Sequence, residues 1–239
     1  AYDVTGDGMK DKIRIRAANQ TDDEAYTSLT VSVNGKTAYR LKNTRFYNVI
    51  ANIYTLKNGQ PFLYLYAPAD NGDGPVCALL KYTNGKFRKA LDFTEIMAGY
   101  GNHRIGEVTN LNGNKIVITE SIVSYSLGIN AINFTYKYVN GKFVPTSRYG
   151  SYKEIYSADG SSRYFTVNSD LPAYTRPGAT AVNTTLKTGS LTKIIKCALI
   201  SGKMYIQLEC DGEIYWIKAL ENPPIADNER QFMEVRYAG

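Results

Sequence analysis

Residues 51–93 read ANIYTLKNGQPFLYLYAPADNGDGPVCALLKYTNGKFRKALDF, and this stretch decides the fold. Short runs rich in β-branched and aromatic residues are separated by turn-forming Gly, Asn and Asp. The sequence Asn84-Gly85 between two such runs is the strongest local signal for a hairpin, because both residues tolerate positive φ in a type I′ turn. The stretch therefore predicts four antiparallel strands, at 52–55, 62–66, 76–82 and 86–91.

The same unit recurs on either side of this stretch. The tripeptide Asn-Gly-Lys appears at Asn34-Gly35-Lys36, Asn84-Gly85-Lys86 and Asn140-Gly141-Lys142. The flanking β-rich segments can be laid over one another, which defines three copies spanning 2–43, 51–93 and 106–147. In residues 12–16 (KIRIR) the apolar side chains occupy every second position, which puts them on one face of a strand.

Tandem four-stranded meanders are typical of β-propeller blades. We therefore expect an all-β protein with a propeller-like array of three four-stranded repeats over residues 1–155, followed by an SH3-like barrel over 156–239. The alternative for the repeats is a pair of stacked sheets that use the same hairpins. The polar break at 157–162 marks the expected boundary.

Composition narrows the class of protein. The chain has 239 residues, 44% hydrophobic content and a net charge of +6, so it is long enough for one large or two modest globular domains. A mildly basic protein favours anionic polymers such as teichoic acid, although the charge also serves solubility. No apolar run is long enough to span a membrane. Because the chain starts abruptly at Ala1, we expect that a signal peptide was removed and that the protein is secreted or surface-attached.

The segment 3–11 (DVTGDGMKD) has the chemistry of a calcium loop. Oxygen-bearing side chains recur at alternate positions, a glycine permits a sharp bend, and hard oxygens suit a hard cation. Followed by a strand, the segment resembles the loops of FG-GAP (integrin-α-like, VCBS) propeller repeats. That resemblance implies a structural Ca²⁺ held by the side chains of Asp3, Thr5, Asp7 and Asp11 and by the carbonyl of Met9. The matching places in copies two and three lack the carboxylates. The alternative is a turn in which Asp and Gly serve backbone geometry.

The C-terminal part carries three short motifs in order: Leu171-Pro172-Ala173-Tyr174, Leu186-Lys187-Thr188-Gly189 and Tyr215-Trp216-Ile217-Lys218. Together they resemble a bacterial SH3 (SH3b) domain. The resemblance implies a groove that binds cell-wall polymer or peptide through Tyr174, Tyr205, Tyr215 and Trp216. The alternative is that Trp216 belongs to the core of the barrel.

Catalytic residues are scarce. The chain has a single histidine, His103, and three cysteines, Cys77, Cys197 and Cys210. Pairing about a turn at Ser201-Gly202 places Cys197 opposite Ile206, so a disulfide to Cys210 would need another register. The sequence therefore indicates a non-catalytic binding protein that does not bind nucleic acid. Two alternatives are a protein-interaction module that uses the repeat face, and a hydrolase with paired carboxylates on separate repeats.

Overall fold

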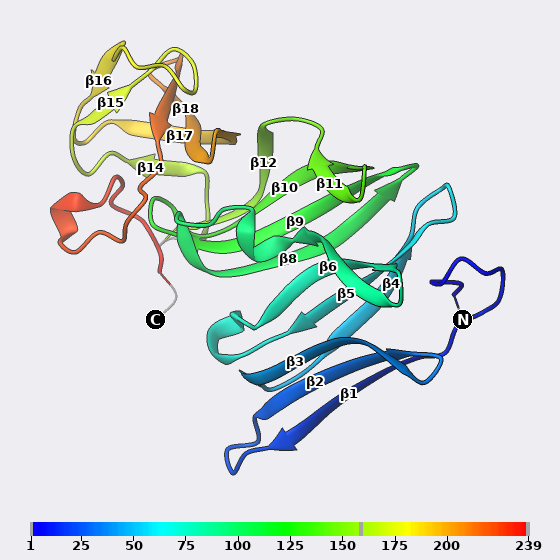
Figure 1. Ribbon diagram of the computed structural model, residues 1–239. Helices are drawn as coiled ribbons and strands as arrows, with labels where there is room; N and C mark the ends of the chain where they lie inside the picture. The colour runs from blue at the N-terminus through cyan, green and yellow to red at the C-terminus, as the bar shows by residue number, and fades with distance from the viewer. Residues whose placement is uncertain (1, 158–159, 238–239) are drawn as a thin grey trace. The chain divides into compact units, whose positions relative to one another are not determined.

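The computed structural model describes residues 2–157 and 160–237, and Ala158 and Asp159 of the expected boundary lie outside them. The described residues form β-strands and three short 3₁₀ helices, and they contain no α-helix. The all-β prediction is confirmed. The chain divides into two compact units (Figure 1). The N-terminal unit comprises 1–96, 108–116 and 136–144, and the C-terminal unit comprises 97–107, 117–135 and 145–239.

The first copy forms a three-stranded antiparallel sheet instead of the expected four strands. Its strands are β1 (Ile13–Gln20), β2 (Tyr26–Val33) and β3 (Lys36–Phe46), in that order. Residues 3–10 form a loop that is closed by a single bridge between Tyr2 and Asp11. A fourth strand is lacking here because the Asp- and Gly-rich segment turns its side chains back onto its own backbone.

The second copy has the four strands that its sequence predicts. They are β4 (Ile50–Thr55), β5 (Pro61–Ala67), β6 (Val76–Thr83) and β7 (Lys86–Asp92), paired in the order β4-β5-β6-β7. The 3₁₀ helix η1 (Asp70–Gly72) lies in the β5–β6 connection, and η2 (Phe93–Glu95) follows β7. In Figure 1 the sheet of the first copy is the blue strands β1–β3, and the sheet of the second copy, β4–β7, runs from light blue to turquoise.

The third copy also has four strands: β8 (Gly101–Asn112), β9 (Lys115–Ser124), β10 (Gly128–Val139) and β11 (Lys142–Pro145). They pair in sequence order, with β11 on β10. Parts of β8, β9 and β10 belong to each compact unit. The single histidine, His103, lies in β8.

All three Asn-Gly reversals have the predicted backbone. Asn34, Asn84 and Asn140 have φ of 50°, 50° and 48°, and the glycine that follows each has φ of 82°, 80° and 90°. A type I′ turn requires positive φ at both central residues, and it matches the right-handed twist of the strands that it joins. The repeat motif is therefore a set of equivalent hairpin turns.

A shared apolar cluster joins the β1–β3 sheet to the β4–β7 sheet within the N-terminal unit. Leu29, Val31 and Val33 of β2 are buried on one face, and they pack in the same cluster as Leu63, Leu65, Ala78 and Leu80 from the second sheet. The alternation along β2 follows from the two-residue period of a strand, which sends Ser28, Thr30 and Ser32 to the other face.

In the C-terminal unit, β12 (Tyr149–Ser157) pairs with both β10 and β17 (Leu191–Ile200). The hairpins continue through β18 (Lys203–Cys210) to β19 (Glu213–Lys218). Gly150 allows β12 to lie close to β10, since a Cβ there would come within 2.5 Å of the Phe134 ring. The expected boundary at 155 falls inside β12.

Shorter strands complete this unit. They are β13 (Gly160–Ser161) on β12, β14 (Tyr164–Thr166) on β17, and the hairpin of β15 (Leu171–Ala173) with β16 (Thr184–Leu186). Among the described residues no sheet closes into a barrel, so the barrel itself stays a prediction.

The C-terminal segment packs against the start of this unit. After η3 (Asp227–Glu229), Phe232 forms a bridge with Val167 and Val235 one with Ser157. The Phe232 ring is fully buried and lies 5.6 Å from that of Phe165. Met233 and Glu234 form a turn between these two isolated bridges, so the segment 231–235 is tied to the unit without forming a strand.

Phe232→Ala should lower the free energy of unfolding by about 3–5 kcal/mol, because it removes a fully buried ring and leaves a cavity. Urea unfolding followed by tryptophan fluorescence measures the change. Met233→Ala is the matched control, since the adjacent Met233 side chain is 49% exposed and should cost little. Equal losses for the two variants would contradict the packing described here.

Candidate functional site

Three of the four predicted groove residues lie together. Tyr174, Tyr205 and Trp216 form one cluster with Ala198, and each aromatic residue is no more than 6% exposed. Tyr174 and Trp216 also pair through their backbones: each N–H donates to the other's carbonyl, at 2.8 and 2.9 Å. The cluster therefore joins the β15–β16 hairpin to β19.

The burial of Trp216 matches the alternative that the sequence left open. Partly buried Ala179 and Ile200 pack against the cluster, and Ala179 lies in the connection between β15 and β16. At 4% exposure the indole uses nearly all of its surface for packing. It is a core residue with little surface available to a ligand.

Tyr215 does not share this surface. It precedes Trp216 in β19 and pairs with Leu208, whereas Trp216 pairs with Gln207. Consecutive strand residues project to opposite faces, so Tyr215 and Trp216 cannot line one groove. The sequence places the two residues side by side, but the strand separates them.

The surface beside the cluster contains residues that the motif comparison missed. Tyr149 of β12 is 37% exposed, and its ring centroid lies 5.9 Å from that of Trp216. Lys196 of β17 places its ammonium 4.7 Å from the Tyr149 centroid and 5.9 Å from the Trp216 centroid. The guanidinium of Arg148 lies 5.5 Å from the Tyr149 centroid. These distances are those of cation–π contacts.

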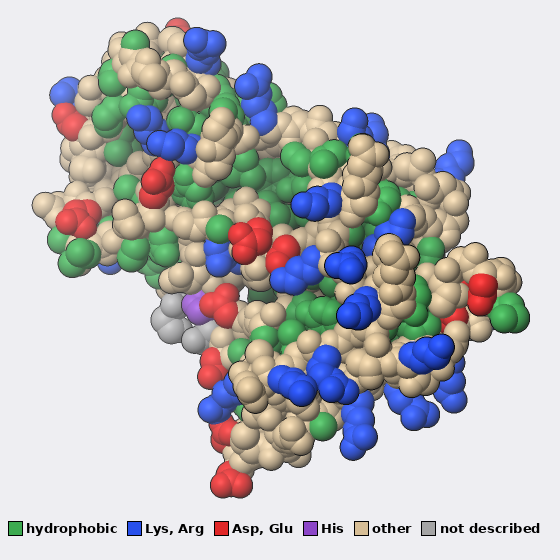
Figure 2. Space-filling model, in the orientation of Figure 1, with side chains coloured by type: hydrophobic (Ala, Val, Ile, Leu, Met, Phe, Trp, Pro, Cys, Tyr) green, Lys and Arg blue, Asp and Glu red, His purple; other side chains and the backbone are tan. Residues whose placement is uncertain are grey.

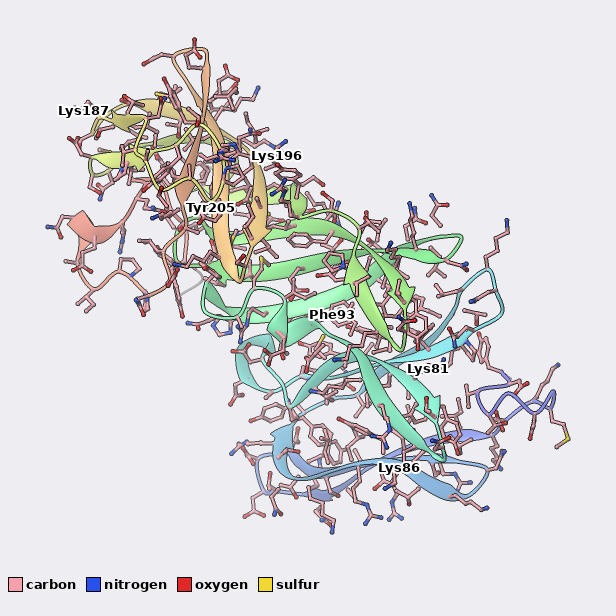
Figure 3. The ribbon with its side chains drawn as sticks, turned by 45° about the horizontal axis from the view of Figure 1, so that its top comes forward. Lys81, Lys86, Phe93, Lys187, Lys196 and Tyr205 are labelled. Atoms are coloured by element: carbon pink, nitrogen blue, oxygen red, sulfur yellow. The ribbon has the colours of Figure 1, made fainter. Side chains whose placement is uncertain are left out.

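Strand register places Tyr149, Lys196, Trp216 and Lys218 on one face, and Arg148, just before β12, joins them through its contact with the Tyr149 ring. Tyr149 is opposite Ala198, Ala198 opposite Tyr205, and Tyr205 opposite Lys218. In the next row Lys196 is opposite Gln207, which is opposite Trp216. Figure 3 labels Lys196 and Tyr205, which come from the neighbouring strands β17 and β18. We call the surface formed by Arg148, Tyr149, Lys196, Trp216 and Lys218 the aromatic–basic face.

The chemistry of the aromatic–basic face suits an anionic or carboxylate-bearing ligand with flat or apolar parts. Lys218 lies 5.3 Å from the ring of Tyr174, so a cation stands at each end of the aromatic row. Within 2–157 and 160–237, Arg148, Lys196 and Lys218 form no ion pair with an acidic side chain. Their charges are therefore available to a ligand.

A pocket of about 340 Å³ adjoins this region. It is lined by residues of β15, β19 and the segments that follow, including Pro172, Tyr174, Lys218 and Glu221. Tyr174 is thus shared between the aromatic cluster and the pocket wall.

The predicted calcium loop is held by its own backbone. The Asp3 carboxylate accepts from the N–H groups of Gly6 and Gly8 at 2.6 and 2.8 Å. The Asp11 carboxylate accepts from the N–H groups of Val4 and Thr5 at 2.7 and 2.9 Å, and from the Asn34 amide at 2.6 Å. This pattern is that of an Asx-type turn, which anchors the loop to the first Asn-Gly reversal.

The fit of these residues to a cation is partial. The Thr5 hydroxyl lies 3.3 Å from carboxylate oxygens of both Asp3 and Asp11, so three predicted ligands converge. Asp7 instead accepts from the N–H of Met9 at 2.8 Å. Both oxygens of Asp3 and of Asp11 already accept hydrogen bonds, so Ca²⁺ would have to share them with N–H donors. The described residues contain no group of three or more His, Cys, Asp or Glu arranged to hold a metal.

The three cysteines are free and buried. Cys197 pairs with Ile206 across the β17–β18 hairpin, as symmetric pairing about Ser201-Gly202 predicts. Burial raises the pKa of the Cys197 thiol to about 12, so it is protonated at neutral pH and is a poor nucleophile.

The hydrolase alternative needs two carboxylates across a pocket. Asp92 and Glu95 line one hollow in the N-terminal unit. Asp92, however, pairs with Lys89 and is the N-cap of η2, where its carboxylate accepts from both the backbone N–H and the hydroxyl of Thr94. Its carboxylate is therefore engaged in local structure.

Glu120 is a buried charged residue that sequence reasoning missed. It is fully buried in β9, within the otherwise apolar series Ile116, Ile118 and Ile122. The sequence does indicate this residue, because Glu120 stands at a position where the alternating pattern of the strand calls for an apolar side chain.

No protein-family model matches this chain, and neither a curated protein nor a solved structure is similar enough to count as a match. No helix among the described residues is long and apolar enough to cross a membrane. The FG-GAP and SH3b resemblances rest on the quoted motifs alone.

Asp11→Asn should lower the free energy of unfolding at pH 7 by about 1–3 kcal/mol, because one amide group cannot replace every acceptor of the buried carboxylate. Burial by itself would raise the pKa of Asp11, but the hydrogen bonds from Thr5, Asn34 and Val4 outweigh it and lower the pKa. The carboxylate thus contributes stability above its unfolded pKa of about 3.9, and this contribution is lost as the pH falls through the folded pKa.

Urea unfolding at pH 7 and at pH 3 measures both effects. The gap between wild type and Asp11→Asn should shrink at the lower pH. Asp7→Asn is the control, since Asp7 is exposed and accepts only one backbone hydrogen bond within the loop. A gap that stayed constant with pH would show that the Asp11 charge has no part in the loop.

Proposed function

We propose that this protein is a non-catalytic binding protein of the bacterial cell surface, whose C-terminal unit contacts a cell-wall peptide. The aromatic–basic face carries the proposal. Peptide ligands offer carboxylates to Lys and Arg, and apolar groups to an exposed ring such as Tyr149. Aromatic and Arg side chains are the residue types that most often dominate binding energy at interfaces.

The strand order of the C-terminal unit supports an SH3b-like arrangement. The first motif falls in the β15–β16 hairpin, and the third forms β19, the last strand of the β17-β18-β19 meander. The ligand surface differs from the one that the resemblance implied. Buried Trp216 packs beneath the ligand surface and supports the Tyr149 ring. Tyr149, Lys196 and Arg148 supply the exposed contacts.

We further propose that the N-terminal unit is a propeller-like scaffold and that its 3–11 loop takes up Ca²⁺. Three converging oxygen side chains support the second point. In this proposal the ion has a structural role, and the protein works outside the cytoplasm, where calcium is ample.

A second candidate function is protein binding by the N-terminal unit. A groove of about 680 Å³ is lined by Ile13 and Ile15 of β1, by Ala51 and Ile53 of β4, and by Leu63 of β5. Among the described residues β1 pairs only with β2 and β4 only with β5, so both are edge strands. An apolar groove beside free strand edges suits an extended segment of a protein partner.

The principal test is co-sedimentation with purified Gram-positive sacculi. Wild type should pellet, and Tyr149→Ala should weaken binding by about tenfold, as expected for an interface residue that contributes more than 1 kcal/mol. Lys196→Gln should weaken it as well. Trp216→Ala is unsuitable alone, because removing a buried indole should cost about 3–5 kcal/mol of stability.

Tyr47→Ala is the matched control for Tyr149→Ala. Tyr47 is 36% exposed and also carries a guanidinium near its ring, that of Arg45 at 5.8 Å, but it belongs to the N-terminal unit. Equal pelleting of wild type and both tyrosine variants would show that the aromatic–basic face does not bind the sacculi. Folded wild type that stays in solution would favour the protein partner.

The calcium loop has its own test. Asp7→Ala should lower the melting temperature in millimolar calcium but leave it unchanged in chelator, where the side chain makes only an exposed turn hydrogen bond. Differential scanning calorimetry under both conditions gives the comparison. The same loss with and without calcium would show that the loop is only a turn.

A further inference from the structure

The first sheet has an unusual charge distribution. Strands β1, β2 and β3 contain no Asp or Glu, whereas Arg and Lys recur along β1 and β3. Figure 2 shows Lys and Arg side chains gathered over the strands of the N-terminal unit. The three strands of this sheet therefore carry cations with no acid of the same strands beside them.

Strand alternation brings four of these cations to one face. Arg14 and Arg16 of β1 alternate with Ile13, Ile15 and Ala17, which pack on the core. Arg16 is opposite Thr30, and Thr30 is opposite Arg40.

The neighbouring rows follow the same pattern. Arg14 is opposite Ser32, and Ser28 is opposite Lys42. A row of hydroxyl side chains on β2 thus runs between cations on β1 and β3. We call this surface the basic sheet face, formed by Arg14, Arg16, Ser28, Thr30, Ser32, Arg40 and Lys42.

The cations of the basic sheet face are exposed and have no acidic partner. Among the described residues Arg14, Arg16, Arg40 and Lys42 take part in no ion pair. Arg45, farther along β3, pairs with Asp23 and is therefore not counted. Four like charges on one sheet repel one another, and a polyanion laid along the face would relieve that repulsion.

The spacing suits a polymer better than a small anion. Alternate residues of a strand are about 7 Å apart, and β1 and β3 are about 10 Å apart because one strand lies between them. The charges therefore form two short parallel rows with hydroxyls between. A single phosphate could reach only one or two of them.

We propose that the basic sheet face binds a polyol-phosphate polymer, a chain in which phosphodiesters alternate with hydroxyl-bearing carbons. Arg and Lys take the phosphates, and the Ser and Thr oxygens accept hydrogen bonds from the hydroxyls of the polyol. The Ser28 and Ser32 hydroxyls themselves donate to the carbonyls of Ala18 and Arg14. Single-stranded nucleic acid is the less suitable occupant, because its binding surfaces use aromatic platforms for the bases, and this face has none. The inference does not depend on the proposed peptide binding, which uses another sheet in the other unit.

The test is titration calorimetry of the full chain with synthetic poly(glycerol phosphate) at several salt concentrations. Wild-type affinity should fall steeply with salt. A variant with four Gln replacements should bind at least tenfold more weakly, and its slope of log affinity against log salt should be shallower by roughly 3. The replacements are Arg14→Gln, Arg16→Gln, Arg40→Gln and Lys42→Gln. If that variant fails to fold, the two double variants of β1 and of β3 should each show part of the loss.

The control variant removes the same charge from exposed lysines beside hairpin turns elsewhere: Lys86→Gln, Lys115→Gln, Lys142→Gln and Lys203→Gln. It should keep at least half of the wild-type affinity. Equal losses in the two variants would show attraction to net charge alone and overturn the proposal. Tighter binding of oligothymidylate than of poly(glycerol phosphate), lost in the same variant, would assign the face to nucleic acid and also overturn it. Tyr149→Ala should leave the affinity for poly(glycerol phosphate) unchanged. A negative result in this titration therefore does not count against the peptide proposal, and a negative sedimentation result does not count against this one.

Discussion

The two-residue reversals with left-handed backbone are the constraint on which the rest of this structure depends. Asn34-Gly35, Asn84-Gly85 and Asn140-Gly141 close hairpins of the repeats, and Ser201-Gly202 and Asp211-Gly212 close those of the C-terminal sheet, all with positive φ at both residues. A turn of fixed length sets the register of the strands that it joins. Since a slip of one residue would move every side chain to the opposite face, these turns decide which residues are buried and which meet solvent.

The two candidate surfaces follow from that register. On β1–β3 it buries Leu29, Val31 and Val33 and leaves cations and hydroxyls outside. On β17–β19 it aligns Lys196 with Trp216 through Gln207. On β1–β3 one face packs on the core while the other presents cations, whereas on β17–β19 the cations lie on the same face as buried Tyr205 and Trp216. These open, polar sheet faces are the basis of the binding roles proposed above.

The extent to which the sequence predicted this protein differs between its parts. The second copy has its four strands where the turn residues indicated, because Asn-Gly and Gly-rich turns specify local backbone strongly. The first copy lacks its expected fourth strand, since the carboxylates of Asp3 and Asp11 accept the hydrogen bonds of backbone N–H groups in their own loop. Of the predicted groove, Tyr174, Tyr205 and Trp216 came together, but they are buried, and Tyr215 projects to the other face.

By itself the sequence determined the all-β class, the repeat, the hairpin turns and the position of Cys197 opposite Ile206, because these depend on residues close in the chain. Only the tertiary structure decided that β12 pairs with β17, which brings Tyr149 beside Lys196 and Trp216. It also decided that β8–β10 contribute to both compact units. The physical reason is that pairing between strands distant in sequence depends on which edges and apolar faces are left after the local hairpins have formed, and no local turn encodes that choice.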